Sequence, residues 1–202
     1  ALFEAPTIAE LSARVQAIGA DQPACIDSAA APIAATGALG GPLSSAQEAL
    51  WLIERVDADS GSRYNIPFAL HLRGPLQVPA LRAALRALVR RHAVLRTAIR
   101  EVGGVPAQTV LDSDEPDFAV VAMTGSDEAT DNFYPGALRL QLAAHESFDL
   151  TAGRPLRVRL FSRTPSDHVL LVVVHHIVSD GLSSSIFNRE LSALYEAALA
   201  SA

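Results

Sequence analysis

The sequence predicts an α+β fold in which a mixed β-sheet packs against helices. The run HVLLVVVH at residues 168–175 is apolar without alternation, which is typical of a strand buried on both faces. The stretch 79–95 places its leucines at helical spacing, and alternating strands flank it along the chain. Strands and helices mixed within a chain of 202 residues form a layered domain around one sheet.

The first part of the chain predicts a short helix followed by a linker. Residues 6–18 carry start signals at Pro6 and Thr7 and apolar side chains along one helical face at Ile8, Leu11, Val15 and Ile18. Residues 19–41 are rich in Ala, Gly and Pro and have no periodicity, so we expect a linker. The folded domain is predicted to cover residues 42–202.

Three elements open that domain. A helix is expected after the candidate caps Ser44 and Ser45, in SSAQEALWLIERV. The stretch YNIPFALHL alternates and predicts a strand with one apolar face, formed by Ile66, Phe68, Leu70 and Leu72. The next helix, over residues 79–95, has an apolar stripe at Leu81, Leu85, Leu88 and His92 and basic residues on another face at Arg82, Arg86 and Arg90.

The remaining elements follow in the same manner. Residues 96–111 predict a hairpin that turns at Gly103 and Gly104, and residues 117–123 a further strand. A helix is expected over 136–147 and an alternating strand, PLRVRLFS, over 155–162, before the buried strand. The last helix, 183–199, begins at a serine cap cluster and is expected to point inward at Ile186, Leu191, Leu194, Tyr195 and Ala198.

Composition excludes several classes of function. The net charge of -6 and pI near 5.5 argue against a nucleic-acid-binding surface. Cys25 is the only cysteine, so there is no intrachain disulfide, and we expect a reducing, cytoplasmic location. The longest apolar run, Val169–Val174, is too short to span a bilayer. The chain starts with Ala and ends in a helical pattern, so we expect it to be a piece of a longer protein.

The stretch HHIVSDG at residues 175–181 is the candidate site. Adjacent strand residues point to opposite faces, so one histidine would face a cleft as a general base and the other would face the core and bond to backbone. Asp180 could orient an imidazole or pair with an arginine, and Gly181 allows a sharp turn and close approach of a ligand. A metal site would lack ligands. The alternative is two structural histidines and an Asp cap.

Several ordered motifs resemble the condensation domains of non-ribosomal peptide synthetases, which are related to the chloramphenicol acetyltransferase fold. HHIVSDG resembles the family's HHxxxDG, and PLSSAQEALW its opening S-x-A-Q-x-x-L-W motif. RRHAVLRTAI at 90–99 resembles R-H-E-x-L-R-T-x-F, with Ala93 for Glu and Ile99 for Phe. YNIP at 64–67 and FDLTAGRPLRVRL at 148–160 lie in the family's order. LFEAPTIAEL resembles the last helix of a peptidyl carrier domain, which would assign residues 1–18.

The resemblance implies roles for individual residues. His176 would be catalytic, helping to deprotonate or to position the acceptor amine as it attacks the donor thioester. His175 and Asp180 would be structural, with Asp180 in a salt bridge to Arg91 or, less favoured, Arg96; the alternative for both arginines is a solvated helix face. The N–H of Gly181 would favour the oxyanion. Ser183 is a weaker candidate and is expected to cap the helix, and Leu182, where the family has Trp, is expected to reflect packing alone.

The resemblance also implies partners. Donor and acceptor would arrive on the 4'-phosphopantetheine of upstream and downstream carrier domains, beside an adenylation domain, in the synthesis of an antibiotic, siderophore or other secondary metabolite. We expect no cofactor or metal bound to this chain itself. The preceding carrier helix suggests an L-configured donor. Epimerisation domains share HHxxxDG, but their following helix reads like VSWRIL, whereas this chain has LSSSIF.

The match covers only the amino-terminal, chloramphenicol acetyltransferase-like lobe of the family, so the chain is expected to be inactive without its carboxyl-terminal lobe. Two alternatives remain at this point. One is a coenzyme A-dependent acyltransferase of the same superfamily, against which the carrier-like start argues. The other is a non-catalytic piece that docks carriers or serves as a scaffold.

Overall fold

The computed structural model describes residues 7–21, 39–56, 62–123 and 137–201. The chain forms two compact units, Ala1–Gly37 and Ala38–Ala202. In the first, helix α1 (Ile8–Asp21) begins with a capping box, because Thr7 Oγ1 accepts from Glu10 N–H and the Glu10 carboxylate accepts from Thr7 N–H. α1 ends at Asp21, so residues 19–21 of the predicted linker belong to this helix. Residues 22–38 of that linker, which include Cys25, lie outside the described residues.

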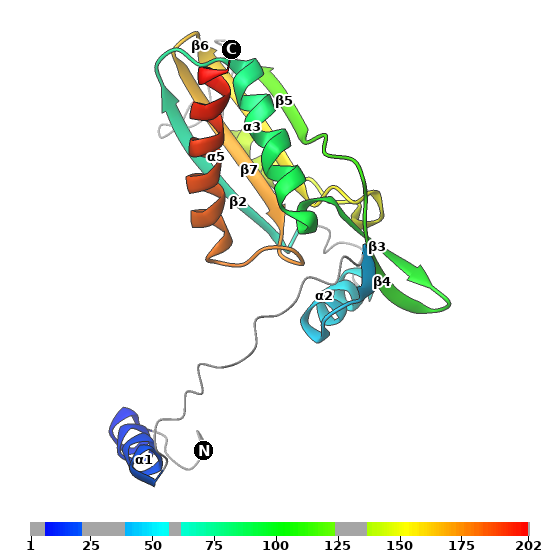
Figure 1. Cartoon of the computed structure of the whole chain (residues 1–202), viewed down its shortest axis with the longest axis vertical. Coiled ribbons are helices and arrows are strands. Elements are labelled where there is room, and N and C mark those ends of the chain that lie inside the picture. The colour runs from blue at the N-terminus through cyan, green and yellow to red at the C-terminus, as the bar shows by residue number, and fades with distance from the viewer. Residues whose placement is uncertain (1–6, 22–38, 57–61, 124–136, 202) are drawn as a thin grey trace. The chain divides into compact units, whose positions relative to one another are not determined.

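The main sheet of the second unit is mixed, as the sequence predicts (Figure 1). Its strands are β2 (Asn65–Arg73), β5 (Asp117–Ala122), β6 (Leu156–Thr164) and β7 (Asp167–His175), in the order β2-β7-β6-β5. β7 is antiparallel to both of its neighbours, whereas β5 and β6 run parallel. The strand that ends at His175, directly before His176, thus lies inside the sheet.

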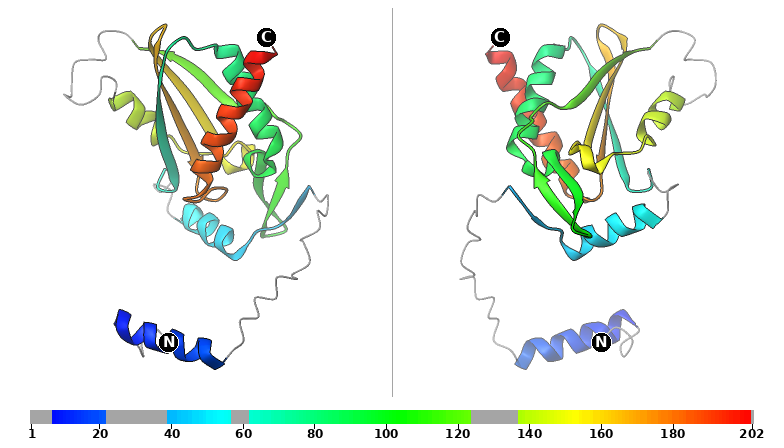
Figure 2. Two further views of the ribbon diagram at one scale, coloured as in Figure 1. Left: turned by 60° about the vertical axis from the view of Figure 1, so that its left-hand side comes forward. Right: turned by 90° about the vertical axis from the view of Figure 1, so that its right-hand side faces the viewer.

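Helices cover both faces of this sheet (Figure 2). α3 (Val78–Arg91) and α5 (Ser183–Ala200) pack side by side on one face, and α4 (Ala137–Ala144) lies on the other. Alternate residues of β7 enter the two cores, Leu170, Val172 and Val174 toward α3 and α5, and Leu171 and Val173 toward α4. Burial on both faces is why the sequence of β7 shows no alternation.

β6 differs from the half-buried strand that its alternating sequence predicts. Arg157 is only 6% exposed, and its guanidinium lies 4.4 Å from the centre of the Phe148 ring. It donates to the carbonyl oxygens of Glu146, at 2.8 Å, and Ser147, at 3.0 Å. The arginine is buried because backbone carbonyls and an aromatic face replace the water that it loses.

A second, three-stranded sheet was not expected, because the prediction had one sheet. The predicted hairpin forms from β3 (Thr97–Val102) and β4 (Val105–Val110), and it turns at Gly103 and Gly104, whose φ angles of 61° and 85° favour glycine. A short strand, β1 (Gly40–Pro42), pairs with β4. Residues 40 and 41, assigned to the linker from their composition, thus belong to the folded unit.

A third, small core joins this sheet to the rest of the unit. It consists of Leu43, Ile99 and Ile177, and helix α2 (Ser45–Val56) packs Leu50 and Trp51 against it. α2 begins where expected. Ser44 Oγ accepts from Gln47 N–H, and Gln47 Oε1 accepts from Ser44 N–H, a second capping box.

Two predicted helices differ in detail. α3 ends at Arg91, because His92 is extended (φ -102°, ψ 98°), and the 3₁₀ turn η2 (Ala93–Arg96) follows; a second 3₁₀ turn is η4 (Leu150–Ala152). In α5, Ile186 is 39% exposed rather than inward, whereas Phe187 packs edge-on against Phe68 at 5.5 Å. Among the described residues, no helix has the length and apolarity needed to cross a membrane.

Candidate active site

The two histidines lie where β7 ends and the chain turns toward α5. His175 N–H still bonds to Pro155 O on β6's side, and His176 N–H bonds to Tyr64 O on β2's side. Their side chains diverge, as expected for neighbours on a strand. His175 is fully buried, whereas His176 is exposed.

His175 is held from both ring nitrogens. Its Nδ1 accepts a hydrogen bond from Ile177 N–H at 3.1 Å, and its Nε2 lies 2.6 Å from Oε1 of Glu54 on α2. Because Nδ1 faces a donor and Nε2 faces a carboxylate, the hydrogen-bond network assigns the Nε2–H tautomer. Tyr64 and Phe148 contact the ring edge-on. The structure thus places His175 in the core with a backbone hydrogen bond, and its structural role stays a prediction.

His176 has the opposite tautomer. Its Nδ1 lies 2.8 Å from Ser179 O, and a carbonyl oxygen can only accept, so Nδ1 carries a proton and the lone pair of the neutral ring is on Nε2. The ring lines an open groove of about 450 Å³. α2 contributes Gln47 and Leu50 to the lining of this groove. The exposed histidine therefore presents a potential base to a space large enough for part of a substrate.

Asp180 caps α5. Its Oδ1 accepts from Leu182 N–H, Ser183 N–H and Ser183 Oγ, at 3.1, 3.0 and 2.7 Å. The bonds from the Ser183 hydroxyl and N–H, followed by the bond from Leu182, hold the pKa of Asp180 below its usual 3.8. Ser183 was expected to be the cap, but it is the first helical residue and acts as a donor to the aspartate.

The expected salt bridge from Asp180 to Arg91 or Arg96 is corrected by the structure. Arg91 Nε lies 3.3 Å from Glu190 on α5, and Arg96 donates to Leu111 O at 2.6 Å. The carboxylate of Asp180 is instead satisfied within its own turn. Because the chain folds back on itself locally there, three donors reach the aspartate without a residue from α3 or η2.

The cap makes stability depend on pH. We expect Asp180→Asn to lower the free energy of unfolding at pH 7, because the amide loses the charge that the N–H donors and the helix dipole favour. The folded pKa of Asp180 lies below its unfolded value, so the contribution of the carboxylate is complete above the unfolded value and disappears as the pH falls through the folded one. Urea unfolding at pH 7, 5 and 3 measures this.

The exposed Glu48→Gln variant on α2 controls for the change in net charge. A gap between native and Asp180→Asn protein that stayed constant from pH 7 to pH 3 would contradict the capping role.

A sharp turn was the expected reason for glycine at position 181, but Gly181 does not adopt a left-handed backbone conformation. Its φ is outside the positive range, and a Cβ built on it would meet no atom within 4 Å. The protein itself therefore does not require glycine at this position. Leu182, in the place of the family's Trp, is 74% exposed. Packing within the described residues does not account for that side chain.

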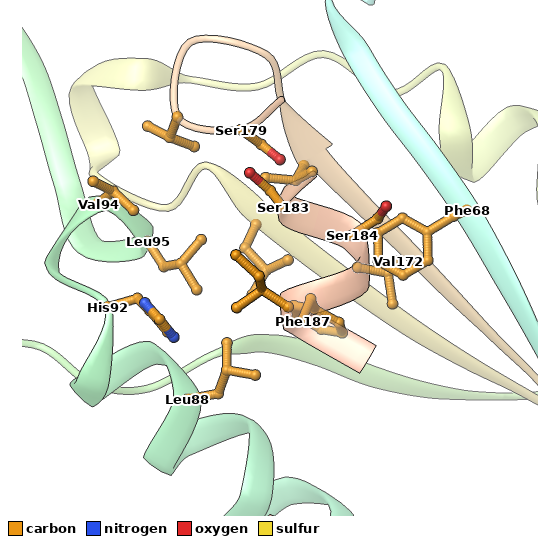
Figure 3. Close-up of a pocket in the computed structure, with 14 residues that line it drawn as sticks. Phe68, Leu88, His92, Val94, Leu95, Val172, Ser179, Ser183, Ser184 and Phe187 are labelled. Carbon is orange, nitrogen blue, oxygen red and sulfur yellow. The ribbon is translucent and has the colours of Figure 1, made fainter. Parts of the chain in front are cut away.

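A second hollow adjoins the groove (Figure 3). It has a volume of about 130 Å³ and lies between the η2 region, the sheet and α5. Its lining is mostly apolar, with Leu88, Leu95, Val172 and Phe187 prominent among the side chains. It shares Val178, Ser179 and Ser183 with the groove, so the two spaces meet beside the histidine loop.

Two site residues were missed by sequence reasoning. Glu54 contacts His175, and Gln47 donates from Nε2 to Ile177 O at 3.1 Å. Their spacing of seven residues places both on one face of α2, two turns apart, but it does not indicate which distant residues that face contacts. In the described part of the chain, no three His, Cys, Asp or Glu side chains group as a metal site.

Comparison with known proteins gives consistent matches. A family model described as "Condensation domain" matches residues 41–201. The chain is 41% identical over 195 residues to a probable non-canonical nonribosomal peptide synthetase, CymA, of Salinispora arenicola, covering 96% of this chain and 2% of that protein. It is 37% identical to a linear gramicidin synthase of Brevibacillus parabrevis, covering 98% of this chain and 4% of that protein. The chain thus spans a small part of these relatives.

Solved structures agree on the fold. The X-domain in "Complex of the X-domain and OxyB from Teicoplanin Biosynthesis" is similar with a TM-score of 0.72 and 34% identity, over 83% of this chain and 35% of that one. The starter condensation domain of rhizomide synthetase RzmA is similar with a TM-score of 0.69 over 79% and 38% of the two chains. Its identity is 21%, so it supports the fold alone.

Proposed function

We propose a function from the premise that this chain belongs to the condensation domain family of nonribosomal peptide synthetases: it forms the histidine-bearing lobe of an enzyme that makes amide bonds. The donor would be an acyl or peptidyl thioester, expected to be L-configured, and the acceptor an aminoacyl group. Both would be carried on the phosphopantetheine of neighbouring carrier domains, beside an adenylation domain, in the cytoplasm. A carboxyl-terminal lobe would complete the site, since the chain covers 35% and 38% of the two solved relatives.

One observation carries this proposal. Nδ1 of His176 is engaged by Ser179 O, so the lone pair of the neutral ring is on Nε2, and the side chain lines the groove. We propose that Nε2 accepts the proton of the acceptor amine as the amine nitrogen attacks the thioester carbon. The new C–N bond forms, the C–S bond breaks, and the proton passes to the departing thiolate. The N–H of Gly181, in the turn just before α5, would favour the negative charge that develops on the carbonyl oxygen.

The test uses the sequence extended to a two-lobed domain, with donor and acceptor carriers loaded as thioesters. We expect a dipeptide on the acceptor carrier, detected by mass spectrometry of the intact carrier. Equal product from free coenzyme A thioesters would favour the alternative acyltransferase. The proposal fails if several carrier pairs give no product while the extended protein is folded.

A second candidate function is docking without catalysis. Its support is the likeness to an X-domain whose structure was solved in a complex with another protein, OxyB. Under this alternative, the extended protein would bind carriers or another protein component without forming product, and His176→Ala would leave that binding unchanged. The exposed His176 side chain in the lining of the groove, with Nδ1 engaged by Ser179 O, favours the catalytic proposal over this one.

A further inference from the structure

We infer that Glu54 is a positioning residue for the proposed reaction, and that α2 fixes the peptide around His176 through two side chains, Glu54 and Gln47. The inference rests on the proposed function for its effect on rate. Its structural basis is independent of that function. Neither the HHIVSDG motif nor the opening PLSSAQEALW motif predicted the contact between Glu54 and His175.

The first attachment is direct. Nε2 of Gln47 donates to Ile177 O at 3.1 Å, while its Oε1 accepts from Ser44 N–H at 3.0 Å. The amide is therefore held at both ends, by the helix cap and by the loop. Since Gln47 is fixed by the capping box at the start of α2, the carbonyl of the residue that follows His176 is fixed relative to the same helix.

The second attachment passes through His175. Glu54 Oε1 lies 2.6 Å from His175 Nε2, and the two side chains are 17% and 0% exposed. A short, charge-assisted bond shielded from water is among the stronger hydrogen bonds in proteins. It keeps the proton on Nε2, which leaves Nδ1 free to accept from Ile177 N–H at 3.1 Å. Both backbone groups of Ile177 are thus tied to α2.

The other tautomer of His175 would break this arrangement. With the proton on Nδ1, two donors would face each other, Nδ1–H and Ile177 N–H, and Nε2 would offer a lone pair to a carboxylate. The Ile177 N–H would then lose its partner. Glu54 therefore does more than fill space, because it selects the form of the buried ring that holds the loop. His176, whose own N–H bonds to Tyr64 O at 2.8 Å, lies directly before the clamped residue.

Small displacements of a catalytic group have large effects on rate, on the order of 10²-fold for about 1 Å. We therefore expect Glu54→Ala in the two-lobed domain to lower kcat for amide formation by roughly 10- to 100-fold. The KM for the loaded acceptor carrier should change less than about twofold, because Glu54 lies behind His175 and does not line the groove. The matched control is Glu48→Ala, an exposed glutamate on the same helix.

Two conservative variants separate reach from charge. Glu54→Gln keeps the length and an oxygen that accepts from Nε2–H, so we expect it to retain most of the rate. Glu54→Asp keeps the charge but is one methylene shorter, so it should resemble Glu54→Ala. The opposite order, Asp active and Gln inactive, would overturn the inference.

The decisive readout does not depend on activity. Long-range ¹H–¹⁵N spectra of the histidine-labelled chain report which ring nitrogen carries the proton. We expect the Nε2–H form for His175 in the native chain and in Glu54→Gln, and a shift toward Nδ1–H or a mixture in Glu54→Ala. An unchanged tautomer and an unchanged kcat in Glu54→Ala would overturn the inference. If the native enzyme makes no product, the proposed function fails, and the tautomer measurement alone decides the positioning role.

Discussion

Replacing His176 with alanine in the two-lobed domain is expected to lower amide formation by a factor of about 10² to 10⁴, the usual contribution of a general base. The side chain is exposed, and its Nδ1–H bonds to Ser179 O at 2.8 Å, within its own loop. Its removal therefore takes the base away and leaves all three cores filled. The rate is measured as single-turnover transfer between loaded carriers, with circular dichroism and urea unfolding to verify the fold.

His145→Ala is the matched control. His145 is also exposed, and its Nδ1 bonds to a local carbonyl, Gln141 O, at the same distance of 2.8 Å. It lies just after α4, outside the residues that line the groove. We expect this variant to keep its full rate. Full activity of folded His176→Ala protein would show that positioning by the groove, without His176, carries the reaction.

Leu85→Ala is expected to lower the free energy of unfolding by about 2 to 5 kcal/mol, the range for a buried leucine whose removal leaves a cavity. Leu85 is fully buried on α3, in the core that also contains Leu160 and Val172. Alanine is the better helix former, so a loss of stability cannot come from helix propensity. Urea unfolding of the chain measures the change.

Leu142→Ala provides the comparison. Leu142 is 64% exposed on α4, so its truncation should change the unfolding free energy by no more than about 0.5 kcal/mol. Losses of equal size in the two variants would mean that α3 does not carry the main core.

Much of the fold follows from local patterns in the sequence. The unbroken apolar run of β7 predicted burial on both faces, and the two glycines predicted the hairpin. Patterns failed where distant groups decide the outcome. Arg157 reads as an outward residue of an alternating strand, but the carbonyls of Glu146 and Ser147 bury it. β1 has the composition of a linker, and only its pairing with β4 makes it a strand.

In the candidate site, too, local patterns predicted some features, and contacts between residues distant in sequence decided the others. Opposite directions for His175 and His176 follow from strand geometry alone. The partner of Asp180 was predicted from a family motif as an arginine, whereas local N–H groups satisfy it. The partner of His175 is 121 positions away, on α2, and no local pattern identifies it. The sequence identified the site residues that lie together in one short motif. It did not identify Glu54, which contacts that motif only after folding.

The small core of Leu43, Ile99 and Ile177 has a consequence for local stability. Amide exchange in folded proteins proceeds through cooperative units, and segments with little buried apolar surface open at lower free energy than the main core. The loop that bears His176 is anchored in this smallest core, whereas the strand before it is shared by the two larger ones. Separation of Ile177 from Leu43 and Ile99 removes the apolar part of this anchor, whereas Gln47 and His175 still hold the two backbone groups of Ile177. We therefore expect the amides of the loop that bears His176 to exchange with solvent at a lower free energy than those of β7, which hydrogen exchange of the chain measures.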